Sequence, residues 1–204
     1  MLLAIDTSAG TAVAIVADDG RVIAERSSAD TRRHAEVIGP LLSEVLAAAE
    51  VDDARLTHVV AGIGPGPFTG LRVGIAAARA VAIARGIPLL AVPSHEAVAL
   101  RLTEGGVAAG RFAVITDARR REVAVTVFAA QLPLPAEVES AHLVARAAFA
   151  PAEGVTPFEA QEIPAAALAH AALARLATGV AFPEAQPLYL RAPDVTLSTP
   201  KRVS

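Results

Sequence analysis

Two segments of this chain, 111 positions apart, follow the same pattern of an apolar run, an aspartate, four turn residues and a second apolar run. Residues 2–16 align with residues 113–127 without a gap, and the alignment places Asp6 opposite Asp117. Apolar runs rich in Val, Ile and Ala that flank a short turn are typical of antiparallel hairpins. A hairpin that recurs in this way predicts an internal duplication and hence two related lobes; a chance match between two ordinary hairpins is the alternative.

The first half of the chain continues from its hairpin into alternating helices and strands. An Asp-Gly turn at residues 19–20 predicts a third antiparallel strand. Apolar spacing predicts strands at residues 2–5, 11–17, 22–25, 59–63 and 89–92, and helices at residues 34–49, 68–84 and from Ser94, its N-cap, onward. Hairpin strands followed by helices and strands in alternation predict an α/β lobe with a mixed sheet at residues 1–102.

The second half predicts a smaller lobe at residues 103–204. Prolines punctuate the chain after residue 130, where residues 139–149 are compatible with a short helix. An Ala-rich helix is expected at residues 164–177, and a Pro-rich tail at residues 183–204 is expected to wrap the surface. If this lobe began as a copy of the first, it is now the reduced copy.

Composition limits the chemistry that the chain can perform. It has 204 residues, of which 53% are hydrophobic, and this is ample for a packed core. A net charge of −3 and an aromatic content of 3% are unlike those of nucleic-acid binders, which use basic residues and stacking rings. The absence of Cys excludes thiolate metal sites and a cysteine nucleophile.

Metal-ligating and nucleophilic patterns are also missing from the sequence. No two of its five His residues are three to five positions apart, so there is no helical pair of metal ligands, and we expect these residues at the surface or at helix ends. No G-x-S-x-G motif marks a serine nucleophile. The sequence therefore predicts no catalytic residue and no metal ligand.

Asp6, Thr7 and Ser8, at the end of the first strand, form a candidate cofactor-binding site. A carboxylate followed by small residues can hold a metal–phosphate group while backbone N–H groups face the phosphate oxygens. The alternative is a turn that the Asp and Ser side-chain oxygens close. Both interpretations stay open, and the turn is favoured.

Residues 62–70, with four glycines and two prolines, invite comparison with a phosphate-binding loop. Such loops hold phosphate with backbone N–H groups, and Pro65 and Pro67 have none. The expected lysine is also missing, because Gly70 is followed by Leu71 and Arg72. We therefore expect a stiff connector between strand and helix, with Thr69 able to cap the helix.

Small residues at Gly70, Gly74 and Ala78 form a ridge along the helix expected at residues 68–84. Small residues four apart let another helix approach closely. Two glycines inside a helix cost about 1 kcal/mol each, so they require a packing reason. The ridge packs either on its own sheet or on a partner. In the second case, a bulky charge at Gly74 or Ala78 is expected to abolish binding and leave the monomer folded.

Arg119, Arg120 and Arg121 occupy the turn of the second hairpin. Such a charge run is typical of a solvated turn, and contact with phosphate or RNA is the alternative. Small residues are expected in a phosphate-binding turn, so three Arg side chains argue against a second phosphate loop.

Five segments together carry a resemblance: residues 3–8, 34–36, 62–72, 117–119 with 122–123, and 187–191. They resemble the TsaB (YeaZ) family of tRNA threonylcarbamoyladenosine biosynthesis proteins. The resemblance runs through the first hundred residues and returns at two points in the second half. Pro67 departs from it, since the family usually has Ser there.

The resemblance implies a fold and a role. The fold is the actin-like (ASKHA, ribonuclease-H-like) α/β fold of two duplicated lobes, with the second lobe reduced. The family is a non-catalytic relative of TsaD, the subunit that transfers a threonylcarbamoyl group to adenosine 37 of tRNA. The metal-binding His pair of TsaD has no match here, since His34 stands alone. The resemblance thus implies a non-catalytic subunit that scaffolds and activates a TsaD-type transferase.

The resemblance also implies partners, namely a TsaD-type subunit, a TsaE-type ATPase, a second copy of the chain when it is alone, and tRNA only indirectly. The sequence itself shows no basic segment before an apolar run and no apolar run of about 18 residues, so a cytoplasmic location without membrane contact is expected. No cofactor of its own is expected, and ATP is available through partner subunits. The implied contact surface consists of Val37, Leu41, Val45, Gly70, Gly74, Ala78 and Val81.

A second class of function stays open beside this one. It is a nucleotide-dependent enzyme of the actin-like group in which Asp6 organises a metal–phosphate group. This alternative predicts ATP turnover that is lost in Asp6→Ala. A protease has no Ser, Cys or metal constellation to support it.

Overall fold

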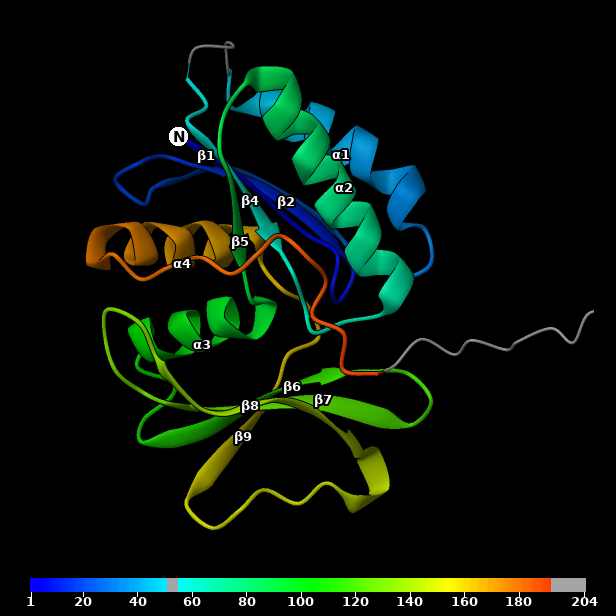
Figure 1. The fold of residues 1–204 in the computed structure, drawn as a ribbon, viewed down its shortest axis with the longest axis vertical. Coiled ribbons are helices and arrows are strands. Elements are labelled where there is room, and N and C mark those ends of the chain that lie inside the picture. Colours follow the sequence, from blue (N-terminus) through cyan, green and yellow to red (C-terminus); the bar gives the residue numbers. More distant parts are fainter. Residues whose placement is uncertain (51–54, 192–204) are drawn as a thin grey trace, which may run out of the picture.

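The first lobe is built on a mixed five-stranded sheet with the strand order β3-β2-β1-β4-β5. The computed structural model describes residues 1–50 and 55–191. The strands of this sheet are β1 (Leu2–Asp6), β2 (Thr11–Val16), β3 (Val22–Ser28), β4 (His58–Gly62) and β5 (Leu89–Val92). Helices α1 (His34–Ala48) and α2 (Phe68–Arg85) cover one face of the sheet (Figure 1).

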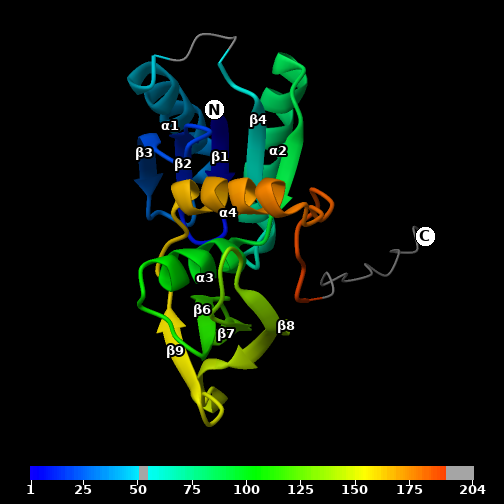
Figure 2. The ribbon, with the colours of Figure 1, turned by 90° about the vertical axis from the view of Figure 1, so that its left-hand side faces the viewer.

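The second lobe is built on a four-stranded sheet with the strand order β8-β7-β6-β9. Its strands are β6 (Arg111–Asp117), β7 (Glu122–Ala129), β8 (Ala136–Ala145) and β9 (Val155–Glu159). Helices α3 (Ser94–Glu104) and α4 (Ala165–Thr178) lie between the two sheets, and α4 runs across the first sheet (Figure 2). The layers are therefore a helix pair, a sheet, a second helix pair and a second sheet.

The two central hairpins have the same strand register, displaced by 111 positions. Leu2 lies opposite Val16 in the first hairpin, and Ala113 lies opposite Val127 in the second. In each lobe a third strand extends the hairpin in antiparallel fashion, and a later strand, β4 or β9, pairs parallel with the first. The predicted α/β fold of two related lobes is confirmed.

The second lobe is the reduced copy, as expected. Between β8 and β9 it has the three-residue 3₁₀ helix η1 (Arg146–Ala148), where the first lobe has the 15-residue helix α1. Within the described ranges its sheet has no counterpart of β5.

The short helix predicted at residues 139–149 is wrong. Residues 136–145 form the strand β8 instead, which pairs antiparallel with β7 through two shifts in register. Ala and Glu residues in this segment favour a helix in isolation, and strand pairing overrides that local preference.

One of the three apolar clusters in the described residues joins the two lobes. It contains Leu2 and Val60 from the first sheet, Phe112 and Phe128 from the second, and Leu168 from α4. The rings of Phe112 and Phe128 stack with their centroids 5.9 Å apart. The boundary expected between residues 102 and 103 falls inside α3, which contributes to this same core.

Residues 183–191, here called the strap, run back over the first lobe beside α2 (Figure 1). The backbone N–H of Leu188 donates to the carbonyl oxygen of Ile63 at 2.8 Å, and Arg79 donates to that of Ala185 at 3.0 Å. This part of the predicted tail lies on the surface, and residues 192–204 lie outside the described residues. No helix in the described part of the chain is both long enough and apolar enough to cross a membrane.

Candidate functional site

Asp6, the last residue of β1, has a buried carboxylate that is only 1% exposed. Its Oδ1 accepts a hydrogen bond from the backbone N–H of Ser8 at 2.7 Å. Its Oδ2 accepts hydrogen bonds from the hydroxyls of Ser8 at 2.9 Å and Ser94 at 2.6 Å. The Ser94 hydroxyl in turn accepts one from the backbone N–H of Gly64 at 3.0 Å. One carboxylate therefore ties the first hairpin to the loop after β4 and to the start of α3.

The space around this carboxylate is closed. A Cβ atom on Gly62 would lie 1.9 Å from Oδ2 of Asp6, so only glycine fits there. Burial raises the pKa of the Asp6 carboxyl above its ordinary value, and the hydrogen bonds from Ser94 and Ser8 oppose that rise. Thr7 and Ser8 are buried as well. The three residues hold their own loops together, in agreement with the turn interpretation, and their carboxylate does not face solvent.

Thr7 explains the ridge of small residues on α2. Its hydroxyl donates to the carbonyl oxygen of Gly70 at 2.8 Å, and a Cβ atom on Gly74 would lie 2.2 Å from that hydroxyl oxygen. A Cβ atom on Gly70 would lie 2.9 Å from Nε2 of His34. The ridge therefore packs on its own lobe. A bulky charge at Gly74 or at the buried Ala78 would disturb the fold, contrary to the expectation that the monomer would stay folded.

The seven residues expected at a partner surface divide by their exposure. Buried within the first lobe are Val45, Gly70, Gly74 and Ala78. Half-buried are Val37, Leu41 and Val81. We call these last three residues the α1–α2 face.

His34 and His95 stand in the first turns of α1 and α3, at helix ends as expected, but both are buried. Nδ1 of His95 lies 2.8 Å from Oγ1 of Thr126, and Nε2 lies 2.9 Å from Oγ1 of Thr116. Burial lowers the pKa of His95 to about 3. His95 therefore joins α3 to the second sheet as a neutral ring. In the described residues, no three His, Asp or Glu side chains are grouped so that they could hold a metal ion.

Neither hydroxyl predicted to cap a helix does so. Pro67 and Pro93 occupy the N-cap positions of α2 and α3, and neither helix has a side-chain cap. Ser94 is the first residue of α3, and its hydroxyl bonds to Asp6 instead. The proline side chain has no oxygen that could accept a hydrogen bond from the first turn, so these helices begin without a side-chain cap.

The turn between β6 and β7 has a left-handed backbone. The φ angles of Arg119, Arg120 and Arg121 are +62°, +52° and +62°. This conformation costs about 1–2 kcal/mol for each L-residue. The Asp117 carboxylate accepts a hydrogen bond from the backbone N–H of Arg119 at 3.2 Å, and the Arg119 guanidinium donates to the carbonyl oxygen of Thr31 at 2.9 Å. Backbone strain of this kind is found at functional sites.

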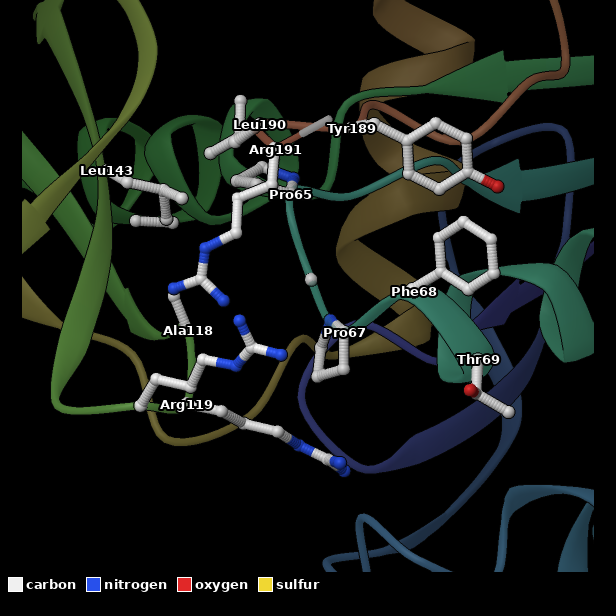
Figure 3. Close-up of a pocket in the computed structure, with 13 residues that line it drawn as sticks. Pro65, Pro67, Phe68, Thr69, Ala118, Arg119, Leu143, Tyr189, Leu190 and Arg191 are labelled. Carbon is white, nitrogen blue, oxygen red and sulfur yellow. The ribbon is translucent and has the colours of Figure 1, made fainter. Parts of the chain in front are cut away.

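A cleft of about 530 Å³ lies between this turn, the loop before α2 and the strap (Figure 3). Phe68 and Tyr189 stack in it with their ring centroids 4.9 Å apart. The Arg72 guanidinium carbon lies 3.8 Å from the centre of the Phe68 ring, and its Nε donates to the Tyr189 hydroxyl at 2.7 Å. The sequence did not predict this pairing, because it depends on the strap crossing back over α2. The one available signal was that Tyr189 belongs to a segment that carries the family resemblance.

The topology and the closed Asp6 site define a two-lobed α/β protein of the actin-like class with a reduced second lobe. Comparison with protein families agrees with this class. The family model described as TsaD, tRNA N6-adenosine threonylcarbamoyltransferase, matches residues 21–134, and the chain belongs to this family.

Individual relatives and a solved structure confirm the resemblance to TsaB (YeaZ). YeaZ from Pseudomonas aeruginosa is 25% identical with a TM-score of 0.77, and the match covers 93% of this chain and 99% of that one. The tRNA threonylcarbamoyladenosine biosynthesis protein TsaB of Bacillus subtilis is 34% identical over 123 residues, which are 60% of this chain and 52% of that protein. An uncharacterized protein of Mycobacterium tuberculosis is 47% identical over 124 residues, 60% of this chain and 56% of the relative. The chain thus spans about half the length of these two curated relatives.

Proposed function

We propose that the chain is a non-catalytic subunit in the threonylcarbamoyladenosine modification of tRNA at adenosine 37, and that it scaffolds and activates a TsaD-type transferase. The observation that carries the proposal is the closed environment of Asp6. Both carboxylate oxygens accept hydrogen bonds from the chain's own Ser8 and Ser94. A metal–phosphate group needs a carboxylate that it can reach from solvent. We therefore assign the Asp6 carboxylate a structural role, in which it holds the first hairpin to the neighbouring loops.

The relatives support the choice of pathway. The family model is described by the transferase activity, and the Bacillus subtilis relative is described by the biosynthesis of the same modified nucleoside. In this proposal a TsaE-type ATPase joins the assembly and brings the nucleotide, and the isolated chain forms a homodimer through the surface that otherwise meets the transferase.

Light scattering and a modification assay test the proposal together. The chain is measured alone over a range of concentrations and then mixed with the TsaD-type protein from the same source. We expect a new species with the mass of one chain of each, and faster threonylcarbamoylation of tRNA than with the transferase alone. Two unchanged peaks without any gain in modification would overturn the proposal. ATP turnover by the isolated chain that disappears in Asp6→Ala would favour the nucleotide-dependent enzyme instead.

A pair of variants on α2 tests the surface. Val81 belongs to the α1–α2 face, whereas Ile83 is 74% exposed and lies about 200° further around the helix. Val81→Glu places a charge in the contact and is expected to weaken the complex about tenfold or more. Ile83→Glu is the matched control and is expected to bind like the wild type. If both variants bind equally well in folded protein, the α1–α2 face is not the contact surface.

A further inference from the structure

Helix α1 has a Gly-Pro pair near its middle, where both residues oppose helix formation. Gly39 and Pro40 are the sixth and seventh of its 15 residues, and both are exposed. Proline is the least favourable residue inside a helix, and glycine is the next. The first turn of a helix tolerates proline, but Pro40 lies beyond that turn. The pair therefore requires a reason other than helix formation.

Packing within the chain does not supply that reason. A Cβ atom on Gly39 would meet no other atom within 4 Å, so alanine fits at this position. At Gly70 and Gly74 of α2, by contrast, a Cβ atom would collide with the fold. The buried residues of α1 lie on the opposite side of the helix from Pro40. An exposed pair that breaks a local rule without a structural gain is typical of a functional surface.

Pro40 leaves a hydrogen-bond acceptor open on the outer side of α1. In a regular helix the carbonyl oxygen of Glu36 accepts a hydrogen bond from the N–H of residue 40, and proline has no N–H. The proline ring also clashes with this carbonyl group and turns it outward. Gly39, beside it, has no side chain that could cover the backbone. A polar group of another molecule can therefore reach the Glu36 carbonyl oxygen.

The charges of α1 around this oxygen are negative. Glu36 and Glu44 stand one turn before and one turn after Pro40, and their side chains are 63% and 58% exposed. The helix itself contains no Lys or Arg. Glu36 pairs with Arg33 at 2.6 Å. Glu44 pairs with Arg26 at 3.6 Å. Both pairs are exposed and therefore weak, so a cation that binds the carbonyl oxygen would also be attracted by both carboxylates.

We propose that an arginine or lysine side chain of the transferase donates a hydrogen bond to the Glu36 carbonyl oxygen, between the carboxylates of Glu36 and Glu44. The inference rests on the proposed function, since it adds one contact to that complex. Val37, which belongs to the α1–α2 face, lies about 60° around the helix from Pro40, so the new contact adjoins that face (Figure 1). Pro40 is then a specificity-determining residue, which lowers the stability of α1 and favours binding.

The variant Pro40→Ala separates this role from a structural one. Alanine supplies the missing N–H, so the variant is expected to melt about 2–4 °C higher and to bind the transferase at least about tenfold more weakly. Melting is measured at a concentration at which light scattering gives the mass of one chain, so that self-association does not contribute. If the fold needs the proline, for example for a bend in α1, the variant melts lower. A lower melting temperature, or an unchanged affinity, would overturn the proposal.

Two further variants show whether affinity depends on this backbone or on stability in general. Gly39→Ala covers the oxygen with a methyl group and is expected to melt higher and bind about threefold more weakly. Ala177→Gly is the matched control, because Ala177 is exposed in the last turn of α4, on the other face of the first sheet (Figure 2). It is expected to melt lower and bind like the wild type. A loss of affinity in Ala177→Gly as large as in Pro40→Ala would contradict a contact at α1.

Salt tests the charge of the group that the transferase contributes. A cationic group predicts that the wild-type complex weakens several-fold between about 0.05 M and about 0.5 M salt, and that Glu44→Gln weakens it about threefold at low salt. An affinity that neither change affects would overturn the inference. A wild-type chain that forms no complex would overturn the proposed function as well. A wild-type complex that Pro40→Ala leaves intact would overturn the inference alone.

Discussion

Thr7 and Gly74 approach so closely that any side chain at position 74 would overlap the Thr7 side chain. Alanine is normally better than glycine inside a helix by about 1 kcal/mol. At Gly74, however, a Cβ atom would lie 2.2 Å from the Thr7 hydroxyl oxygen, which is committed to the carbonyl of Gly70. Overpacking of this kind typically costs about 1–3 kcal/mol. We therefore predict that Gly74→Ala lowers the free energy of unfolding by about 1 kcal/mol or more, measured by urea denaturation.

The control for this prediction is a double-mutant cycle. Thr7→Ala removes the hydroxyl that the new methyl group would meet, so Gly74→Ala is expected to cost less in that background, with a coupling energy of about 1 kcal/mol. The same cost in both backgrounds would contradict the proposed contact between Thr7 and α2.

His95 makes the stability of the protein depend on pH. In the folded chain its pKa is about 3, against an ordinary value near 6.5, so below pH 6.5 the unfolded chain takes up a proton that the folded chain refuses. We predict that the free energy of unfolding falls between pH 6.5 and pH 3, by at most about 1.4 kcal/mol per pH unit from this group. His95→Gln is expected to remove that slope in urea titrations at several pH values.

An exposed histidine supplies the matched control. His142 is exposed on β8, and His142→Gln is expected to keep the slope of the wild type. If His95→Gln and the wild type lose stability in parallel as the pH falls, His95 does not carry the effect.

At the scale of elements, one ion pair adds to the apolar packing between α3 and α4. Arg175 donates through Nε and Nη2 to the two carboxylate oxygens of Glu96, and the two side chains are 11% and 12% exposed. Removal of one partner leaves the other charge buried and unpaired. We predict that Arg175→Met lowers the free energy of unfolding by about 3–5 kcal/mol, and that adding Glu96→Leu restores much of the loss. Urea denaturation of both proteins measures this.

A surface ion pair serves as the comparison. Arg111 and Glu139 lie 3.4 Å apart with half of each side chain exposed, so Arg111→Met is expected to change stability by less than about 1 kcal/mol. A double variant at Arg175 and Glu96 that is no more stable than Arg175→Met would show that the buried charge is not the cause.

Sequence patterns predicted the elements of the first lobe well, because each has a local signal. The hairpin turns contain Asp and Gly, and the apolar residues of α1 and α2 recur with helical spacing. The strand β8 has no such signal, since its pairing with β7 decides its structure. The cap predicted at Ser94 was wrong for a similar reason, because the Ser94 hydroxyl donates to the Asp6 carboxylate on β1, far away in the sequence.

In the candidate site, too, the residues with a local sequence signal were predicted and the contacts between distant segments were not. Asp6 and the arginine turn could be singled out because unusual residues follow one another there. The partners of Asp6 on β4 and α3, and the pairing of Phe68 with Tyr189, come from segments far apart in the chain. Only the fold brings such residues together, so the spacing of neighbouring residues in the sequence could not predict these contacts.

At the scale of the whole molecule, each sheet packs against the helix that follows the other sheet in the chain. Helix α3 follows the last strand of the first sheet and contacts β6 of the second, whereas α4 follows the last strand of the second sheet and packs across the first. Their apolar residues lie in one core with Leu2 and Phe112. Each sheet also has an apolar cluster of its own on its other face, but one face of each is buried in this shared core. The duplicated lobes are therefore expected to depend on each other for stability.

This dependence predicts a single cooperative unfolding transition for both lobes. Phe112 is fully buried in the shared core, so Phe112→Ala, although it lies in the second sheet, is expected to cost about 3–5 kcal/mol and to lower the melting temperature of the entire chain. Calorimetry is expected to give equal van't Hoff and calorimetric enthalpies. The ring signals of Tyr189, which is held against α2 of the first lobe, are expected to lose their native positions at the same temperature. If Phe112→Ala instead melted the second sheet first and left Tyr189 native, each lobe would have to be stable by itself. The shared core would then be an interface between two domains.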